Sequence, residues 1–481
     1  MQHCAHRSDH HHTTREFDPR IRPSTSGGLM TDTGSTATEA VPTPVIRKAI
    51  AASAIGNATE WYDYGVYAAT VSYLTHAFFP GELGTIGTML GFAVSFVLRP
   101  LGGFIWGPIG DRLGRKHVLA LTILLISLAT ALIGVLPTHA VAGVWAPVLL
   151  IALRVVQGFS TGGEYGGAAT FMAEYAPASK RGRFGSFLEF GTMAGFASGT
   201  AIVLLLDLGL SDDQMQTWGW RIPFLIALPL GLAGLYLRSQ LDDPPMFTDI
   251  EDDIPEKQSL LGQLRETIVG YWRPILIMFG MVVALNVANY TLLAYQPGYL
   301  KETIGLGETA GSVVVLIGQV VMMCLIPLFG MWSDSTGRKP MWAVSLAGLF
   351  IFAVPMYWLM GQGVVWAIIG FVVLGALYIP QLATISATFP AMFPTQVRYA
   401  GFAIAYNLST AAFGGTAPLV NDAVVGGTGW NLFPAVYLMI ACVIGGAALL
   451  FLKETAGVSI AGTEIPGEDV DDEESDPVTA S

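Results

Sequence analysis

Two acidic side chains in the first long apolar stretch have the type and spacing that best suit chemistry. Glu60 and Asp63 are followed one helical turn later by Tyr67, and such spacings place all three on one face of a helix. Two carboxyl groups in a low-dielectric setting repel each other when both are ionised, which favours a proton on one of them. The pair is therefore a candidate proton-binding site. The alternative is that both carboxylates neutralise arginines and only hold helices together.

Two arginines also fall in apolar stretches, where lipid would penalise an unpaired charge. Arg99 and Arg154 are therefore expected to face a polar interior. Each can pair a carboxylate or hold the carboxyl group of a substrate through two parallel hydrogen bonds. Beyond Arg154, Gln157 and Glu164 share a helical face. We expect Arg154 and Glu164 to join the two acidic residues of the first stretch in proton coupling.

Uncharged polar and aromatic residues carry the chemistry of the second part of the chain. Asn286 and Tyr290 share a helical face and suit hydrogen bonds to a small zwitterion. Aromatic rings attract a quaternary or secondary ammonium group through cation–π interaction, although an aromatic residue in a membrane helix more often serves packing. The predicted substrate-binding residues are Tyr67, Arg99, Gln157, Asn286 and Tyr290.

These residues need membrane-spanning helices to position them, because the composition is that of a membrane protein. Of 481 residues, 52% are hydrophobic and 12% are charged, whereas a soluble protein carries roughly 25% charged residues. The apolar runs are continuous rather than alternating, which favours helices over a β-barrel. We predict an all-α membrane protein with twelve spans, near 49–73, 85–109, 118–137, 144–172, 184–206, 221–237, 274–296, 312–332, 341–360, 364–389, 400–421 and 433–452.

The distribution of basic residues predicts which side of the membrane each loop occupies. With the N-terminus inside, every Lys and Arg falls in a cytoplasmic segment except Arg221 and Lys301 outside and the two arginines within spans. We therefore expect both termini to be cytoplasmic, in the inner membrane of a bacterium. The net charge of −12 arises mainly in the polar segments 242–256 and 467–476, so it gives no support for nucleic-acid binding.

An internal repeat divides the chain into two related halves. The loop after the second span reads GPIGDRLGRK (107–116), and the loop after the eighth reads GMWSDSTGRK (330–339). Such a repeat indicates a duplicated six-helix unit. We predict an N-terminal bundle at 45–238, a linker at 239–273 and a C-terminal bundle at 274–453, flanked by a disordered extension at 1–44 and an acidic disordered tail at 454–481. Translation begins at Met1 or Met30.

Charged residues in these loops are expected to latch the two halves together rather than to touch a substrate. Acidic residues can cap a helix or pair with a base across the interface. The predicted latch consists of Asp111, Arg115, Lys116, Glu174, Arg181, Asp334, Arg338 and Lys339. Glu189 is placed in the same region, where Arg181, Arg183 or Arg115 can pair with it.

The repeated loop resembles the signature of the major facilitator superfamily. A narrower resemblance, to its metabolite:proton symporter family, covers nearly all of 45–455. It is carried by GNATEWYDYGVYA (56–68), RPLGGFIWGPIGDRLGRK (99–116), QGFSTGGEYGGA (157–168) and PAMFPTQVRYAGFAIAYN (390–407). Within that family the chain is similar to bacterial proline/glycine betaine transporters. The resemblance implies proton-coupled import of a compatible solute by alternating access, with substrate, proton and lipid bilayer as partners and no obligate protein partner.

Other functions fit the sequence less well. A relative that imports an organic acid such as citrate or 2-oxoglutarate remains the alternative. Drug/proton antiport is disfavoured, since GTMAGFASGTAI (191–202) has no proline where the antiporter motif needs one. No constellation for an enzyme, a cofactor or a metal ion is readable. The tail after Lys453 has no heptads, so regulation through a coiled coil is not implied.

Overall fold

The computed structural model describes residues 43–81, 84–113, 115–239 and 260–460, together with 462, 465 and 466. Within this part of the chain the regular secondary structure is entirely helical, which confirms the predicted all-α fold. The predicted N-terminal extension up to residue 42 and most of the linker lie outside the described residues.

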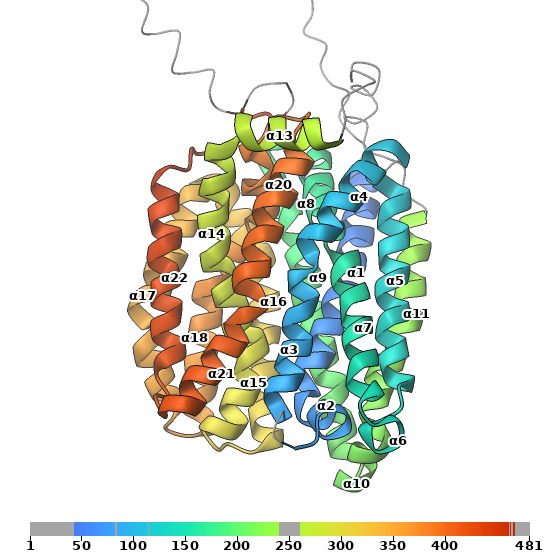
Figure 1. The fold of residues 1–481 in the computed structure, drawn as a ribbon. Coiled ribbons are helices and arrows are strands. Elements are labelled where there is room, and N and C mark those ends of the chain that lie inside the picture. The colour runs from blue at the N-terminus through green and yellow to red at the C-terminus, as the bar shows by residue number, and fades with distance from the viewer. Residues whose placement is uncertain are drawn as a thin grey trace, which may run out of the picture. The chain divides into compact units, whose positions relative to one another are not determined.

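The N-terminal half contains the elements from α1 to α11 (Figure 1). Their bounds are α1 Thr43–Ala69, α2 Val71–Phe78, α3 Gly84–Val97, α4 Arg99–Leu113, α5 Arg115–Val135, α6 His139–Ala142, α7 Trp145–Thr161, α8 Glu164–Tyr175, η1 Ala178–Lys180, α9 Arg181–Gly209, α10 Asp212–Gln214, η2 Met215–Gly219 and α11 Arg221–Ser239.

The C-terminal half follows a helix that belongs to the predicted linker, α13 Leu260–Gly270. Its elements are α14 Trp272–Tyr290, η3 Thr291–Tyr295, α15 Gln296–Gly298, η4 Tyr299–Thr303, α16 Glu308–Thr336, α17 Arg338–Met360, α18 Val364–Leu382, α19 Ile385–Thr388, η5 Pro390–Met392, α20 Arg398–Ser409, η6 Thr410–Gly414, α21 Thr416–Thr428 and α22 Phe433–Leu450. Four of the segments, η2, η3, η4 and η6, are π-helical.

Several of the helical segments are long and apolar enough to cross a membrane. Among the described residues, eight meet both conditions, or nine when the bent pair Asp212–Gly219 and Arg221–Tyr236 counts as one span. The other predicted spans correspond to α1, which carries two acidic residues, to α5, whose apolar part is Ala120–Val135, and to α20 with α21, which η6 separates.

The bundle is apolar on its surface and polar at defined points inside, the reverse of a soluble protein. Large aliphatic side chains such as Val365 and Leu450 are exposed, as lipid contact allows. The largest fully buried side chains include four arginines, Arg99, Arg154, Arg338 and Arg398. A buried guanidinium must be compensated, so these four positions point to the functional parts of the molecule.

Helix packing within each half is close, and several helix pairs join the halves. In the N-terminal half α1 packs on α9, α5 on α11 and α3 on α7, while α14 packs on α22 and α17 on α18 in the C-terminal half. Across the halves, α9 contacts α16 and α4 contacts α20 (Figure 1).

Glycines make the closest of these helix contacts possible. A Cβ atom added at Gly158 of α7 would lie 1.9 Å from the carbonyl oxygen of Ser95 in α3, and one at Gly162 would lie 2.0 Å from that of Arg99 in α4. In α9, a Cβ at Gly191 would lie 2.2 Å from a backbone oxygen of α1. Small residues at such crossings are typical of membrane helices.

The first residues of the predicted disordered tail pack against the bundle instead. The Glu454 carboxylate accepts hydrogen bonds from the backbone N–H groups of Arg338 at 2.8 Å and Lys339 at 2.9 Å, which satisfies the free donors at the start of α17. Ile460 is buried with Ala173 and Ala391, one from each half. Ile460 and Glu454 therefore hold this region against the bundle. The overall acidic composition of the region does not predict contacts made by two single residues.

We predict that Gly158→Ala destabilises the protein. The added methyl group would collide with the backbone of Ser95, so α3 and α7 must separate, and overpacking of this kind costs about 1–3 kcal/mol. The measurement is thermal denaturation of the purified protein in detergent. Gly446→Ala in α22 is the matched control, since nothing lies within 4 Å of the added atom. Equal stability of the two variants would contradict the close approach.

Candidate functional site

Arg154 of α7 and Asp63 of α1 form a buried ion pair. Nη1 of Arg154 lies 2.9 Å from Oδ2 of Asp63. Gln157 joins both, since its Oε1 accepts from Arg154 at 2.9 Å and its Nε2 donates to Asp63 Oδ1 at 2.8 Å. Thr130 of α5 donates to the same carboxylate oxygen at 3.1 Å. Both oxygens of Asp63 therefore have partners, which a carboxylate without water requires.

The rest of the Arg154 guanidinium is also held. Nη2 donates to Ser95 Oγ at 3.1 Å, and Nε donates to the carbonyl oxygen of Gly91 at 3.4 Å. The guanidinium lies 4.3 Å from the ring centroid of Tyr67, whose hydroxyl donates to the carbonyl oxygen of Thr88 at 2.9 Å. Tyr67 is thus a wall of this ion pair, and each of the three guanidinium nitrogens of Arg154 already has a hydrogen-bond partner.

Arg99 of α4 and Glu60 of α1 form a second pair with looser geometry. Nη2 of Arg99 lies 3.7 Å from Oε1 of Glu60, and both side chains are buried. The same nitrogen donates to the hydroxyl oxygen of Tyr64 at 2.8 Å. Nε and Nη1 of Arg99 make no hydrogen bond to any residue that the structure describes. Unsatisfied donors of a buried charge are costly, so these two are suited to a ligand.

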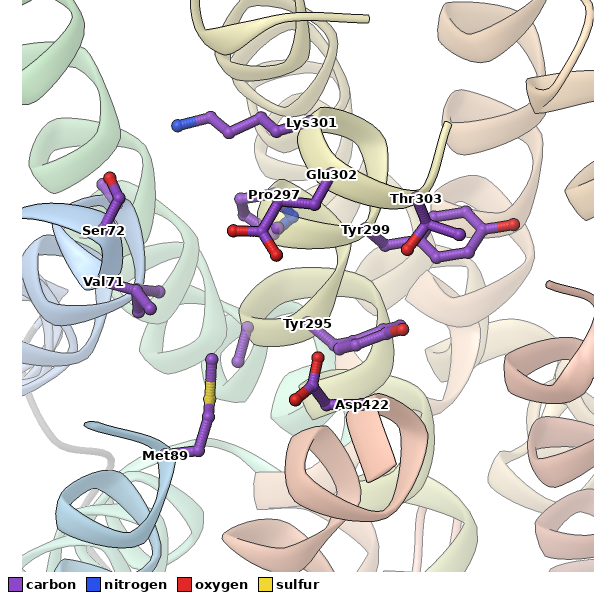
Figure 2. Close-up of a pocket in the computed structure, with 14 residues that line it drawn as sticks. Val71, Ser72, Met89, Tyr295, Pro297, Tyr299, Lys301, Glu302, Thr303 and Asp422 are labelled. Carbon is purple, nitrogen blue, oxygen red and sulfur yellow. The ribbon is translucent and has the colours of Figure 1, made fainter. Parts of the chain in front are cut away.

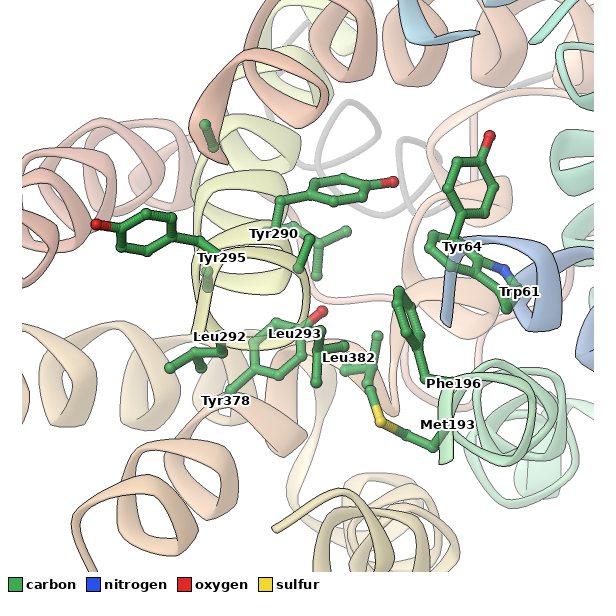
Figure 3. Packing of buried hydrophobic residues seen from close by; sticks show 14 of the residues in the cluster. Trp61, Tyr64, Met193, Phe196, Tyr290, Leu292, Leu293, Tyr295, Tyr378 and Leu382 are labelled. Atoms are coloured by element: carbon green, nitrogen blue, oxygen red, sulfur yellow. The ribbon is translucent and has the colours of Figure 1, made fainter. Parts of the chain in front are cut away.

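Aromatic rings from both halves surround Arg99. Its guanidinium carbon lies 4.7 Å from the ring centroid of Phe96 and 5.2 Å from that of Tyr64. Tyr290 of α14 packs edge-on against Phe96 at 4.9 Å, and its hydroxyl has no hydrogen-bond partner among the described residues. Figure 3 shows Tyr290 lying across from Trp61 and Tyr64 of α1. Arginine donors and aromatic faces therefore meet where the two halves meet.

The two acidic residues of α1 each face a different arginine. Glu60 is opposite Arg99 and Asp63 is opposite Arg154, so the structure offsets both charges rather than leaving them to repel each other. This pairing was the alternative that the sequence left open. The part that the two carboxyl groups play in proton coupling stays a prediction.

Asn286 of the predicted substrate set is used within the C-terminal half. Its Nδ2 donates to Oγ1 of Thr410 at 3.0 Å. Asn286 lies one turn before Tyr290, which directly precedes the π-helical segment η3, and its partner Thr410 is the first residue of the π-helical segment η6. Such segments are frequent at functional sites because they break the regular helical ladder.

A set of charged contacts closes one end of the interface between the halves. Asp334 of α16 accepts from the backbone N–H groups of Gly182 at 2.7 Å and Arg183 at 2.9 Å, at the start of α9. The same carboxylate pairs with Arg338 at 2.8 Å. Glu174 of α8 pairs with Arg398 of α20 at 3.2 Å. We name these four side chains, Asp334, Arg338, Glu174 and Arg398, the latch.

Two further contacts reinforce the latch at the break between α7 and α8. The hydroxyl of Tyr399 donates to the carbonyl oxygen of Gly163 at 2.7 Å, and Nδ2 of Asn407 donates to that of Gly162 at 2.9 Å. The glycine-rich sequence there both ends α7 and lets α4 approach closely. Backbone oxygens freed at the break are therefore bound by side chains of the opposite half.

Two residues predicted for the latch make different contacts. Arg181 donates to the carbonyl oxygens of Ala173 at 3.2 Å and Val458 at 3.0 Å. Lys339 donates to the carbonyl oxygen of Leu452 at 2.9 Å within the C-terminal half. Both bind backbone oxygens where helices end, which sequence spacing does not reveal. The side chains of Asp111, Arg115, Lys116 and Glu164 lie outside the described residues.

Several residues of the site carried no clear sequence signal. Tyr64 and Phe96 are apolar-stretch aromatics like many others, and only the fold brings them to Arg99. Arg398 is not among the residues predicted for the latch, yet it pairs with Glu174. Glu189, expected near basic residues, instead accepts a hydrogen bond from Tyr165 and forms no ion pair within the described part of the chain.

A pocket lies between the halves at the end of the bundle opposite the latch. Residues of α2, α3 and α21 line it together with residues of the segments after α14. Figure 2 shows Tyr295, Glu302 and Asp422 around this space. Two carboxyl groups, Glu302 and Asp422, and one lysine, Lys301, line the pocket together with aromatic rings, so it offers partners for both charges of a zwitterion.

Comparison with known proteins identifies the family. Residues 53–418 match the model of the Major Facilitator Superfamily. The ectoine/proline transporter ProP of Corynebacterium glutamicum is 42% identical over 441 residues, covering 88% of this chain and 87% of that protein. The glycine betaine/proline/ectoine/pipecolic acid transporter OusA of Dickeya dadantii is 39% identical, covering 87% of this chain and 85% of that protein.

The fold agrees with a solved structure of the same superfamily. The proton:xylose symporter XylE, bound to 6-bromo-6-deoxy-D-glucose, superposes with a TM-score of 0.71 at 20% sequence identity, covering 87% of this chain and 98% of XylE. The predicted twelve-helix arrangement in two halves is consistent with this fold. The chain therefore belongs to the major facilitator superfamily and is a multi-pass membrane transporter rather than an enzyme.

Proposed function

We propose that this transporter is a proton-coupled symporter that imports a small zwitterionic compatible solute, such as proline or glycine betaine, by alternating access. One observation carries the proposal: Arg99 has open donors inside walls of aromatic rings that both halves supply. The substrates in the names of the relatives, which include proline, glycine betaine and ectoine, support the same substrate class.

The substrate is held by its two opposite charges. Its carboxylate accepts hydrogen bonds from the open N–H groups of Arg99, a charge-assisted contact that is stronger than a neutral one. Its ammonium group lies against aromatic faces, with Tyr290 and Trp61 as the nearest candidates from the two halves. Since the rings come from both halves, a bound substrate contacts both and can influence how they move.

Glu60 is the carboxyl group best placed to carry the coupling proton. Oε1 of Glu60 lies 3.7 Å from Nη2 of Arg99, the residue proposed to bind the substrate carboxylate. Asp63 is instead held by Arg154 at 2.9 Å and by two further side chains. A proton on Glu60 removes the competing negative charge and leaves Arg99 for the substrate carboxylate. Proton and substrate therefore bind together, as symport requires. Asp63 and Arg154 keep α1 and α7 in place.

The latch and the pocket suggest the direction of movement. The latch end carries most basic residues of the described loops, among them Arg181, Arg183 and Lys339, and the positive-inside rule assigns such an end to the cytoplasm. We therefore place the protein in the bacterial inner membrane with both termini inside. Substrate enters from the end with the pocket and leaves after the latch opens.

An organic acid with several carboxylates is a poorer substrate for this site. Each added carboxylate needs another unengaged cation, and the donors of Arg154 are already bound by Asp63, Gln157 and Ser95.

Uptake of labelled glycine betaine into cells should stop when a protonophore is added, because the proton gradient drives accumulation. Excess proline or ectoine should compete with the label, and citrate or 2-oxoglutarate should not, since one open arginine suits one carboxylate. The measurement is initial uptake with and without each competitor. Uptake that ignores the protonophore would exclude proton coupling.

The two acidic residues of α1 should differ when each is neutralised. Glu60→Gln should keep exchange of betaine across the membrane but lose uptake against a gradient, because the proton site is gone. Asp63→Asn leaves the Arg154 charge buried without its partner, which costs about 3–5 kcal/mol, so it should lose both activities and fold poorly. Proteoliposomes loaded with unlabelled betaine measure exchange and uptake separately. Full gradient-driven uptake by Glu60→Gln would remove Glu60 from the mechanism.

Arg99→Lys should weaken substrate binding while the protein still folds. A lysine keeps the charge but cannot supply the same set of N–H groups beside the rings. Loss of a hydrogen bond to a charged group is worth about 1.5–3 kcal/mol, so KM for betaine should rise about tenfold or more. Arg265→Lys, at an exposed position of α13, is the matched control. An unchanged KM in Arg99→Lys would place the substrate elsewhere.

A further inference from the structure

Glu189 of α9 is a buried carboxyl group that the proposed cycle does not use. It is 1% exposed. The hydroxyl of Tyr165 donates to Oε1 at 2.5 Å, and that of Thr192 donates to Oε2 at 3.1 Å. Among the described residues, no arginine, lysine or histidine forms an ion pair with it. Glu60, Asp63 and Glu174 are also buried, but each of them faces an arginine.

The surroundings of Glu189 offer hydroxyl and amide groups instead of a positive charge. The titratable side chains that face it are Tyr165 of α8, Tyr406 of α20 and Tyr378 of α18. From α1, Asn57 donates to Oγ1 of Thr192 at 2.6 Å and brings no charge. An ionised carboxylate in such a place is disfavoured because two hydroxyl hydrogen bonds do not replace a counter-charge. A protonated carboxyl group carries no charge, and its O–H can donate to one of the same two hydroxyl oxygens.

The group sits directly behind a contact between the two halves. The ring of Tyr165 stacks on that of Tyr406, with centroids 4.6 Å apart, and Tyr406 stacks on Phe402 at 5.5 Å. Tyr165 belongs to the N-terminal half and Tyr406 to the C-terminal half. Tyr399 and Asn407, which reinforce the latch through Gly163 and Gly162, belong to the same helix as Tyr406, α20. Opening of the latch end therefore has to separate Tyr165 from Tyr406.

We propose that Glu189 is a second proton-binding site, separate from Glu60, whose occupancy is tied to closure of the latch end. While that end is closed, the carboxyl group holds a proton. When Tyr165 and Tyr406 separate, water reaches the group, its O–H bond breaks, and the proton passes to water. The carboxylate that remains is hydrated, and it takes a proton back from water before the halves close over it.

The cytoplasmic proton concentration then acts on the conformational equilibrium. A proton bound only in the closed form shifts the balance between closed and open forms by up to about tenfold per pH unit. Acid on the latch side favours the closed form and alkali favours the open form. This inference rests on the proposed function only in that the latch end opens during transport; the protonation state of Glu189 in the closed form does not depend on what is carried.

Infrared difference spectroscopy tests the bound proton directly. The purified protein in lipid nanodiscs at neutral pH should show the C=O stretch of a protonated carboxylic acid that disappears in Glu189→Gln. Tyr165→Phe removes one hydrogen bond to the carboxyl group but leaves the group itself, so the band should persist at a shifted frequency. Asp213→Asn, at an exposed position of the short helix α10, should leave the band unchanged. A spectrum in which Glu189→Gln and wild type do not differ would overturn the proposal, and so would loss of the band in Tyr165→Phe.

Exchange of labelled betaine in proteoliposomes tests the link to opening. External pH is held constant while the pH on the latch side is varied. Wild type and Asp213→Asn should slow as that side becomes acidic, and Tyr165→Phe should keep a pH dependence. In Glu189→Gln the exchange rate should depend less steeply on the pH of the latch side, because the contribution of the Glu189 proton, up to about tenfold per pH unit, is gone. Equal pH profiles in Glu189→Gln and wild type would overturn the inference. Absence of proton-driven uptake in wild type would instead refute the proposed symport. The infrared result on Glu189 would remain valid, because it does not depend on transport.

Discussion

The structure depends on the rule that a charge removed from water inside a membrane must be compensated. Buried arginines therefore fix the arrangement of helices: Arg154 ties α7 to α1 through Asp63, and Arg398 ties α20 to α8 through Glu174. Glycine contacts bring the helices close enough for these pairs to form. The close packing of the helices and the burial of the charge pairs therefore depend on each other.

The places where compensation is incomplete are the places where something else can bind. Arg99 has donors that no described residue binds, and these lie beside aromatic rings, which suits a carboxylate joined to an ammonium group. Glu189 has hydrogen bonds but no counter-charge within the part of the chain that the structure describes, which suits a proton. In the pair of Asp63 and Arg154, each carboxylate oxygen and each guanidinium nitrogen already has a partner. The contribution of this pair is therefore to hold helices in position.

The interface between the halves decides how these openings can be used. Tyr290 faces α1 across the interface near Arg99, and Tyr406 faces Tyr165 in front of Glu189. Each contact joins a side chain of one half to a side chain of the other. A motion that separates the halves therefore changes the surroundings of the substrate site and of the buried carboxyl group together, which is the physical requirement for coupling.

The sequence by itself determined the class of the protein and most of its charged residues. Hydropathy reveals membrane helices because an apolar run is a local property, and Glu60, Asp63, Arg99 and Arg154 stand out because charges are rare in such runs. Only the tertiary structure decided which carboxylate faces which arginine and that Lys339 and Arg181 bind backbone oxygens. It also decided that Glu189 forms no ion pair with any basic side chain among the described residues. Those outcomes depend on contacts between segments far apart in the chain, which helical spacing cannot report.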